Sequence, residues 1–170
     1  MNADPTEYPG YGRHPAFVDS NILLYAHDQS AGEKRRVARD LIQTLWEERS
    51  GRLSIQVLQE FFVNATRKLS RPLETADARE VISDYAYWPV HRPGTVDVLS
   101  AIDLHRGAQI SFWDAMILTS AVAQGCNVLY SEDLGDGQYY GGVRVINPFT
   151  PNSGRTDQPA NPDPGEPTNN

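Results

Sequence analysis

Short apolar segments of β-strand length alternate with segments of helical periodicity along most of this chain. The expected strands are residues 16–18, 53–55, 88–90, 127–130 and 143–146. The first expected helix begins at Ile22. Five further helices are expected at residues 33–49, 57–69, 72–86, 95–106 and 112–124. Each helix can carry the chain back to the amino end of the sheet, so successive strands run in parallel. The alternation therefore predicts an α/β fold with a mostly parallel central sheet and helices on both faces.

Glycine and proline mark several expected boundaries. Gly51 is expected to end the helix 33–49. Pro89 cannot donate a hydrogen bond inside a sheet, so residues 88–90 are expected at an edge. The polar, glycine-rich stretch between residues 130 and 143 is expected to be a loop.

The 170 residues are enough for one domain of this kind, which we place at residues 15–149. Residues 1–14 have no apolar periodicity and are expected to form a flexible leader. Residues 150–170 have no large apolar side chain and are expected to form a disordered tail. No apolar stretch predicts a membrane span or a signal peptide. The single cysteine, Cys126, cannot form an internal disulfide, which fits a cytoplasmic location.

The net charge of −7 argues against a tight nucleic-acid binder. The two ends hold two arginines and five acids, a net −3, which leaves −4 for the domain. Four acids of the domain, Asp19, Glu60, Asp114 and Asp133, account for this charge of −4, so the rest of the domain is neutral. A neutral surface is compatible with an enzyme that holds RNA briefly through a metal ion and a few arginines.

Four acidic residues that are far apart in the sequence are expected at one edge of the sheet. Asp19 follows the strand 16–18, and Asp133 comes three residues after the strand 127–130. Glu60 and Asp114 are expected in the first turns of the helices 57–69 and 112–124. Helices that follow or precede parallel strands in this way begin at the carboxyl edge, where open α/β sheets bind ligands. The four carboxylates are therefore expected to converge.

Such a cluster requires a cation. Two carboxylates about 4 Å apart repel each other by roughly 4 kcal/mol at an effective dielectric constant near 20. Oxygen ligands without cysteine or paired histidine suit Mg²⁺ or Mn²⁺ better than zinc. Ions of this kind polarise phosphoryl oxygens and activate water, so the pattern predicts metal-assisted hydrolysis of phosphate esters.

Each acid also has an ordinary structural interpretation. Asp19 could simply be the N-cap of the helix that follows it, with no role in metal binding. Ser111 and Asp114 have the spacing of a capping box. Glu60 could be a solvated glutamate on the helix surface, and Asp133 is typical of a turn. The metal-site interpretation therefore depends on the convergence of all four.

Four segments resemble the motifs of PIN-domain ribonucleases, in the same order and spacing over residues 16–149. The first is Phe17-Val-Asp-Ser-Asn-Ile-Leu-Leu-Tyr-Ala26, and the second is Gln56-Val-Leu-Gln-Glu-Phe-Phe62. The third is Ser111-Phe-Trp-Asp-Ala-Met-Ile117. The fourth is Asn127-Val-Leu-Tyr-Ser-Glu-Asp-Leu134 with the closing Val143-Arg-Val-Ile-Asn-Pro-Phe149.

The resemblance implies a three-layer α/β/α sandwich and endoribonuclease activity that depends on Mg²⁺ or Mn²⁺. It implies that Asp19, Glu60, Asp114 and Asp133 hold the metal, with Asp19 and Asp114 as the most direct ligands. Asn21 and Ser131 match positions that support the site in relatives. Short members are typically VapC-type toxins of type II toxin–antitoxin systems, so the expected partners are an RNA substrate, a small antitoxin and a second copy of the chain.

Several alternatives stay open at this point. Glu132 or Asp136 could replace Asp133 at the metal. A catalytically inactive RNA- or protein-binding module on the same fold would be expected to have lost the acids, and all four are present. A haloacid-dehalogenase-type phosphatase would need an aspartate where Asn21 stands. The four histidines do not have the spacing of metal ligands, so no role is assigned to them. RNA specificity is expected to reside in loops and in basic residues such as Arg67, Lys68 and Arg71.

Overall fold

A computed structural model describes residues 14–151. Nearly all of the expected leader and tail lies outside this range. The described elements are, in order, β1 (Ala16–Val18), α1 (Ser20–His27), α2 (Glu33–Glu47), β2 (Gly51–Ser54), α3 (Ile55–Ala65), α4 (Thr75–Tyr85), β3 (Val90–His91), α5 (Thr95–Ala108), α6 (Phe112–Ala123), β4 (Val128–Tyr130), β5 (Tyr139–Tyr140) and β6 (Val143–Ile146).

The six strands form one sheet in the order β3-β2-β1-β4-β6-β5. All neighbouring pairs are parallel except β5 and β6, which are antiparallel. The chain moves from β1 to β2 on one side and later returns to β4 on the other side of β1. The direction of winding therefore changes between β1 and β4, and this is the position where open α/β sheets form a ligand-binding crevice.

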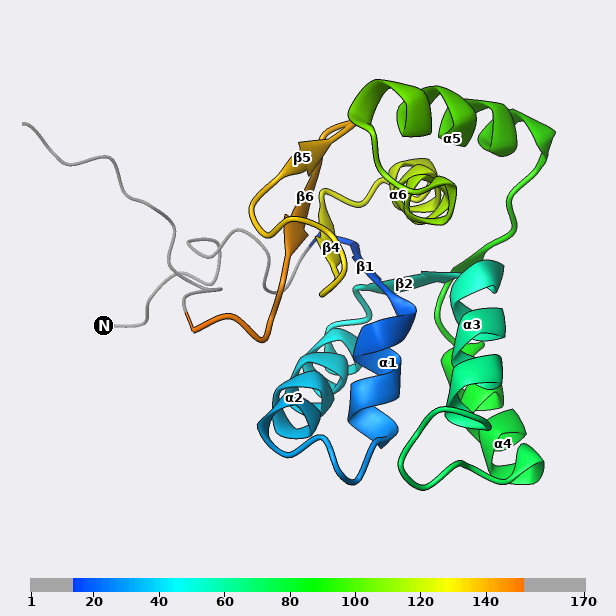
Figure 1. Cartoon of the computed structure of the whole chain (residues 1–170), viewed down its shortest axis with the longest axis vertical. Helices are drawn as coiled ribbons and strands as arrows, with labels where there is room; N and C mark the ends of the chain where they lie inside the picture. Colours follow the sequence, from blue (N-terminus) through cyan, green and yellow to red (C-terminus); the bar gives the residue numbers. More distant parts are fainter. Residues whose placement is uncertain (1–13, 152–170) are drawn as a thin grey trace, which may run out of the picture.

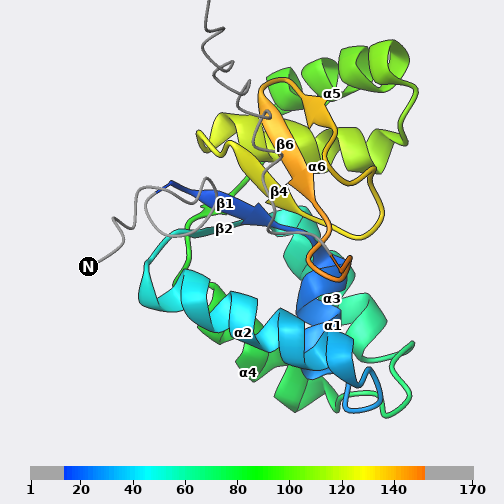
Figure 2. The same cartoon turned by 90° about the vertical axis from the view of Figure 1, so that its left-hand side faces the viewer.

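The helices form two layers around the sheet. Helices α1 to α4 lie on one face, and α5 and α6 lie on the other (Figures 1 and 2). Right-handed crossovers explain this division. The first two connections lead outward from β1 in one direction, whereas the connection through α5 and α6 leads back across the sheet. The structure confirms the predicted three-layer α/β/α fold with a mostly parallel sheet.

The strands are buried on both faces because both helical layers cover them. Phe17, Val18, Leu53, Leu129 and Val145 have no exposed surface.

Cys126 is also buried, and burial raises the pKa of its thiol to about 12. A thiol with so high a pKa is a poor nucleophile, so Cys126 is a packing residue. No helix in the described range is long and apolar enough to cross a membrane.

The prediction that Gly51 ends a helix is wrong. Helix α2 ends at Glu47, and Arg49 makes the turn with a φ of 55°, so that Gly51 is the first residue of β2. Its hydrogen faces the ring of Trp88, and a Cβ atom here would lie 2.3 Å from that ring. The glycine thus provides space for a buried tryptophan, a long-range requirement that the local sequence does not reveal.

Other boundaries also differ from the predictions. Helix α4 begins at Thr75 rather than at Pro72, and the short β3 pairs only with β2, as expected for an edge. The expected loop after β4 contains the strand β5, which forms a hairpin with β6. Gly141 and Gly142 connect the two strands with φ values of 56° and 87°, as a two-residue hairpin turn requires.

Candidate active site

Asp19 stands at the carboxyl end of β1 and is almost completely buried. Its Oδ1 accepts a hydrogen bond of 2.6 Å from the backbone N–H of Ser20, so the side chain caps helix α1. Its Oδ2 accepts a hydrogen bond of 2.7 Å from the hydroxyl of Ser131, which follows β4. Both oxygens are therefore held in place across the switch point between β1 and β4.

Asn21 connects Asp19 with the loop that follows β4. Its Nδ2 donates to Asp133 Oδ2 at 3.0 Å and lies 3.3 Å from Asp19 Oδ2. Its Oδ1 accepts from the backbone N–H of Glu132 at 3.4 Å. A single amide thus lies between two carboxylates and fixes the loop that carries the second of them.

Glu60 approaches the same edge from α3. Its Oε2 accepts from the hydroxyl of Ser20 at 2.8 Å, and its Oε1 accepts from Gln56 Nε2 at 2.8 Å. Helix α3 begins at Ile55, because the Ser54 side chain caps it by accepting from the N–H of Val57. Glu60 therefore lies in the second turn, not in the first turn as predicted, and still reaches Ser20.

Asp114 is near this edge but is not joined to the other three acids. Its Oδ2 accepts from the hydroxyl of Ser111 at 2.6 Å, and its N–H donates back to that oxygen at 3.0 Å. Ser111 is thus the N-cap of α6, as the capping interpretation predicts. Gln56 links the two helices, since its Nε2 also lies 3.2 Å from the carbonyl oxygen of Trp113. Within residues 14–151, no three acids, histidines or cysteines lie close enough together to hold an ion in this arrangement.

The three acids of the loop after β4 have different surroundings. Glu132 forms an ion pair with Lys34 at the start of α2. Asp136 accepts from the N–H of Asn147 at 2.9 Å and from the hydroxyl of Thr150 at 3.2 Å. Of the three, it is Asp133 whose carboxylate accepts a hydrogen bond from the side chain of Asn21, whereas Glu132 contacts Asn21 only through its backbone N–H. The geometry therefore favours Asp133 as the acid that this loop contributes.

Sequence reasoning missed two side chains of the site, Ser20 and Gln56. Both are buried polar residues, and each donates to one oxygen of Glu60. Ser20 is part of the Asp-Ser-Asn run that opens α1, and Gln56 precedes Glu60 by four residues on the same helix. The four-residue spacing was the available signal, because it places the two side chains on one face of a helix.

The surroundings of Asp19 make its ionised form less favourable. Burial raises the pKa of Asp19 most, the nearby Glu60 and Asp133 also raise it, and the hydrogen bonds from Ser131 and Ser20 lower it, so that the resulting pKa is about 6. A buried carboxylate surrounded by other carboxylates is stabilised by a bound cation. The donor atoms are all oxygens, which fits Mg²⁺ or Mn²⁺.

This shift predicts how the stability of the metal-free protein depends on pH. The folded-state pKa of Asp19 is about 6 and the ordinary value is 3.8. The contribution of Asp19 to stability is therefore fully present below about pH 4 and is lost as the pH rises through about 6, by roughly 3 kcal/mol. The Asp19→Asn variant lacks this loss. In EDTA, its free energy of urea unfolding relative to wild type should increase from pH 4.5 to pH 7.5; a constant difference would contradict the shift.

A group of acidic side chains at the switch point of an α/β/α sandwich is typical of proteins that act on phosphate groups with a divalent metal. Residues 16–135 match the PIN domain family. The chain therefore belongs to the PIN domain family, whose members are nucleases that generally use divalent metals. This assignment rules out the haloacid-dehalogenase alternative.

Several solved structures share this fold, whereas no curated protein matches the sequence. A toxin–antitoxin complex from Klebsiella pneumoniae contains a chain with 18% identity and a TM-score of 0.60, and the match covers 79% of this chain and 98% of that one. VapC20 of Mycobacterium tuberculosis, a toxin that cleaves the sarcin-ricin loop, has 20% identity and a TM-score of 0.54, with 69% and 89% covered. VapBC2 from Rickettsia felis, bound to a DNA fragment from its promoter, has 12% identity and a TM-score of 0.55, with 76% and 96% covered.

Proposed function

We propose that this protein is a metal-dependent endoribonuclease and the toxin of a type II toxin–antitoxin pair. The observation that carries the proposal is the meeting of Asp19, Glu60 and Asp133 at the switch point of a PIN domain, linked by Ser20 and Asn21. The sarcin-ricin-loop activity of the similar VapC20 supports RNA as the substrate.

Asp19, Glu60, Asp133 and Asp114 would hold Mg²⁺ or Mn²⁺. When bound, such an ion supplies polarisation of the phosphoryl oxygen and activation of water. The chain contributes orientation: Ser20 and Ser131 fix the two oxygens of Asp19, and Asn21 keeps Asp133 beside it. Asp114 would contribute by turning from Ser111 toward the other acids.

The partners follow from the same family. The solved relatives include toxin–antitoxin complexes, which supports a small antitoxin as the binding partner of this chain. The antitoxin would place an apolar helix between the helices and a basic side chain against the acids, where charge-assisted hydrogen bonds are strong. We also propose a homodimer and a cytoplasmic location.

The proposal is tested with purified protein and a mixture of structured RNAs in Mg²⁺. Wild type should produce discrete fragments. Co-expression with the small protein encoded next to it should give a stable complex without nuclease activity, since the antitoxin would cover the acids. A complex that cuts RNA at the full rate would reject the antitoxin part of the proposal, and wild type that leaves every RNA intact would reject the nuclease part.

A further inference from the structure

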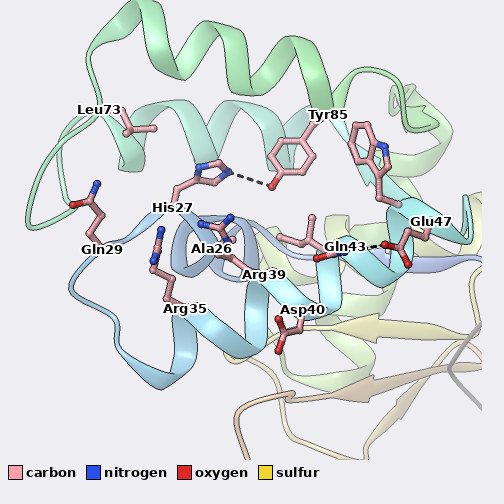
Figure 3. Close-up of a pocket in the computed structure, with 12 residues that line it drawn as sticks. Ala26, His27, Gln29, Arg35, Arg39, Asp40, Gln43, Glu47, Leu73 and Tyr85 are labelled. Carbon is pink, nitrogen blue, oxygen red and sulfur yellow. Dashed lines mark hydrogen bonds between the residues drawn. The ribbon is translucent and has the colours of Figure 1, made fainter.

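A cavity lies between α1, α2 and α4, and none of the four candidate metal-binding acids lines it. It has a volume of about 750 Å³ and is shown in Figure 3. Its lining includes His27 from the end of α1, Arg35 and Arg39 from α2, and Tyr85 from the end of α4. A volume of this size is within the range of ligand-binding pockets.

The two arginines of this cavity lack counter-charges. They stand four residues apart on α2, so both project toward the same side of the helix. Within residues 14–151, neither forms a hydrogen bond or an ion pair, and the Nε of Arg35 is buried without a partner. The pKa of His27 is lowered by burial first, and then by Arg39 and Arg35.

The acids that line the cavity do not neutralise this end of it. Asp40 accepts from Arg36 at 3.0 Å, and Glu47 accepts from Gln43 Nε2 at 2.8 Å. Figure 3 shows Arg35, Arg39 and His27 together, with Gln43 and Glu47 farther along the cavity. The His27 end is therefore a concave site with uncompensated positive charge, which suits an anionic ligand.

We propose that Arg35 and Arg39 hold a phosphate of the RNA strand, outside the position where the strand is cut. This inference rests on the proposed ribonuclease function and extends it to a second contact with the substrate. Guanidinium groups bind phosphate oxygens through paired N–H donors, which favours a phosphate ligand at two neighbouring arginines. Tyr85 adds a hydroxyl to the same end of the cavity.

The position of the cavity fits a strand that also passes the acids. Helix α1 has eight residues and is therefore about 12 Å long. It begins with Ser20 and Asn21 at the acids and ends with His27 at the cavity. Lys34, next to Arg35, is already paired with Glu132. An RNA strand repelled by the acids would thus meet, one short helix away, two arginines that form no ion pair within residues 14–151.

The test measures binding of a fluorescent single-stranded RNA oligonucleotide in EDTA, where no cutting occurs, between 50 and 200 mM salt. Each phosphate contact contributes about 0.7 to the salt slope for single strands. Because the two arginines hold one phosphate, the variant Arg35→Gln/Arg39→Gln should have a slope shallower by about 0.7. Over this fourfold range of salt, its affinity should then fall about 2.6-fold less than that of wild type.

A matched control removes two other arginines. Arg79 and Arg106 are exposed on α4 and α5 and do not line the cavity, so Arg79→Gln/Arg106→Gln should keep the wild-type slope. Equal slopes in all three proteins, an equal change in both variants, or no RNA binding by wild type would overturn the phosphate site. If the cavity variant binds RNA normally but loses the antitoxin, the cavity is a protein-docking surface instead.

The same variants separate this inference from the proposed function. If wild type shows the expected slope but does not cut after Mg²⁺ is added, the nuclease proposal fails and the phosphate site stands. If wild type cuts RNA and the slopes are equal, the phosphate site fails and the nuclease proposal stands. Circular dichroism should show the same helix content in all three proteins, because glutamine is a good helix former.

Discussion

The Asp19→Asn variant is expected to cut RNA at least about a hundredfold more slowly than wild type at saturating Mg²⁺. Asp19 is the buried acid to which Ser20 and Ser131 donate, and it lies beside Glu60 and Asp133. An asparagine would keep the shape and the helix cap but would remove the charge that binds a cation. Single-turnover cleavage of one defined RNA measures the effect on the chemical step.

The control for this variant is Asp136→Asn. Asp136 belongs to the loop after β4, but its carboxylate bonds Asn147 and Thr150 instead of the site. This variant should cut at nearly the wild-type rate, whereas Asp133→Asn should be impaired. If Asp136→Asn loses most of its cleavage rate and Asp133→Asn loses none, then Asp136 is the acid that this loop contributes. The loop would then have to rearrange during the reaction, and the choice of Asp133 would be wrong.

The Asp114→Asn variant is expected to cut RNA more slowly than wild type by a factor similar to that expected for Asp19→Asn. Its stability should change little. Its carboxylate is bonded to Ser111, and an asparagine oxygen can accept the same hydrogen bond. The metal-free variant should therefore melt within a few degrees of wild type, since a cap contributes only about 1 kcal/mol. Mn²⁺ should raise the melting temperature of wild type and raise that of the variant much less.

The comparison variant for a helix-capping role is Asp97→Asn, whose carboxylate also lies 3.8 Å from His91 Nε2. Asp97 caps α5 by accepting from the N–H of Gly94 at 2.7 Å, and it lies in the first turn of its helix as Asp114 does. This variant should change stability by at most about 1 kcal/mol and keep its cleavage rate and its Mn²⁺ response. If Asp114→Asn behaves in the same way as Asp97→Asn, Asp114 is a helix cap only.

The sequence was sufficient for the parts of the site that depend on parallel topology. Asp19 and Asp133 follow strands that are neighbours in the sheet, so the rule that strand ends share one edge brought them together. The rule did not foresee that Asp114 bonds Ser111, because the choice between two partners depends on side-chain rotation. It also gave the wrong turn for Glu60, because the capping of α3 by Ser54 was not recognised.

Long-range packing was beyond the reach of the sequence. The contact between Gly51 and Trp88 joins residues that are far apart in the chain, and its local signal resembled a helix end. The cavity beside Arg35 and Arg39 exists only because α1, α2 and α4 pack in a particular way. Periodicity in the sequence indicates a helix and its apolar side, but it does not determine the space between helices.

The central claim, that the clustered acids act by holding a divalent metal, is tested most directly by removing the metal. Cleavage of one defined RNA by the purified chain is measured in EDTA and again after Mg²⁺ or Mn²⁺ is added in excess. The claim predicts no cleavage in EDTA, full recovery with either ion in wild type, and no recovery in Asp19→Asn. Cleavage by wild type that continues at the same rate in EDTA would contradict it.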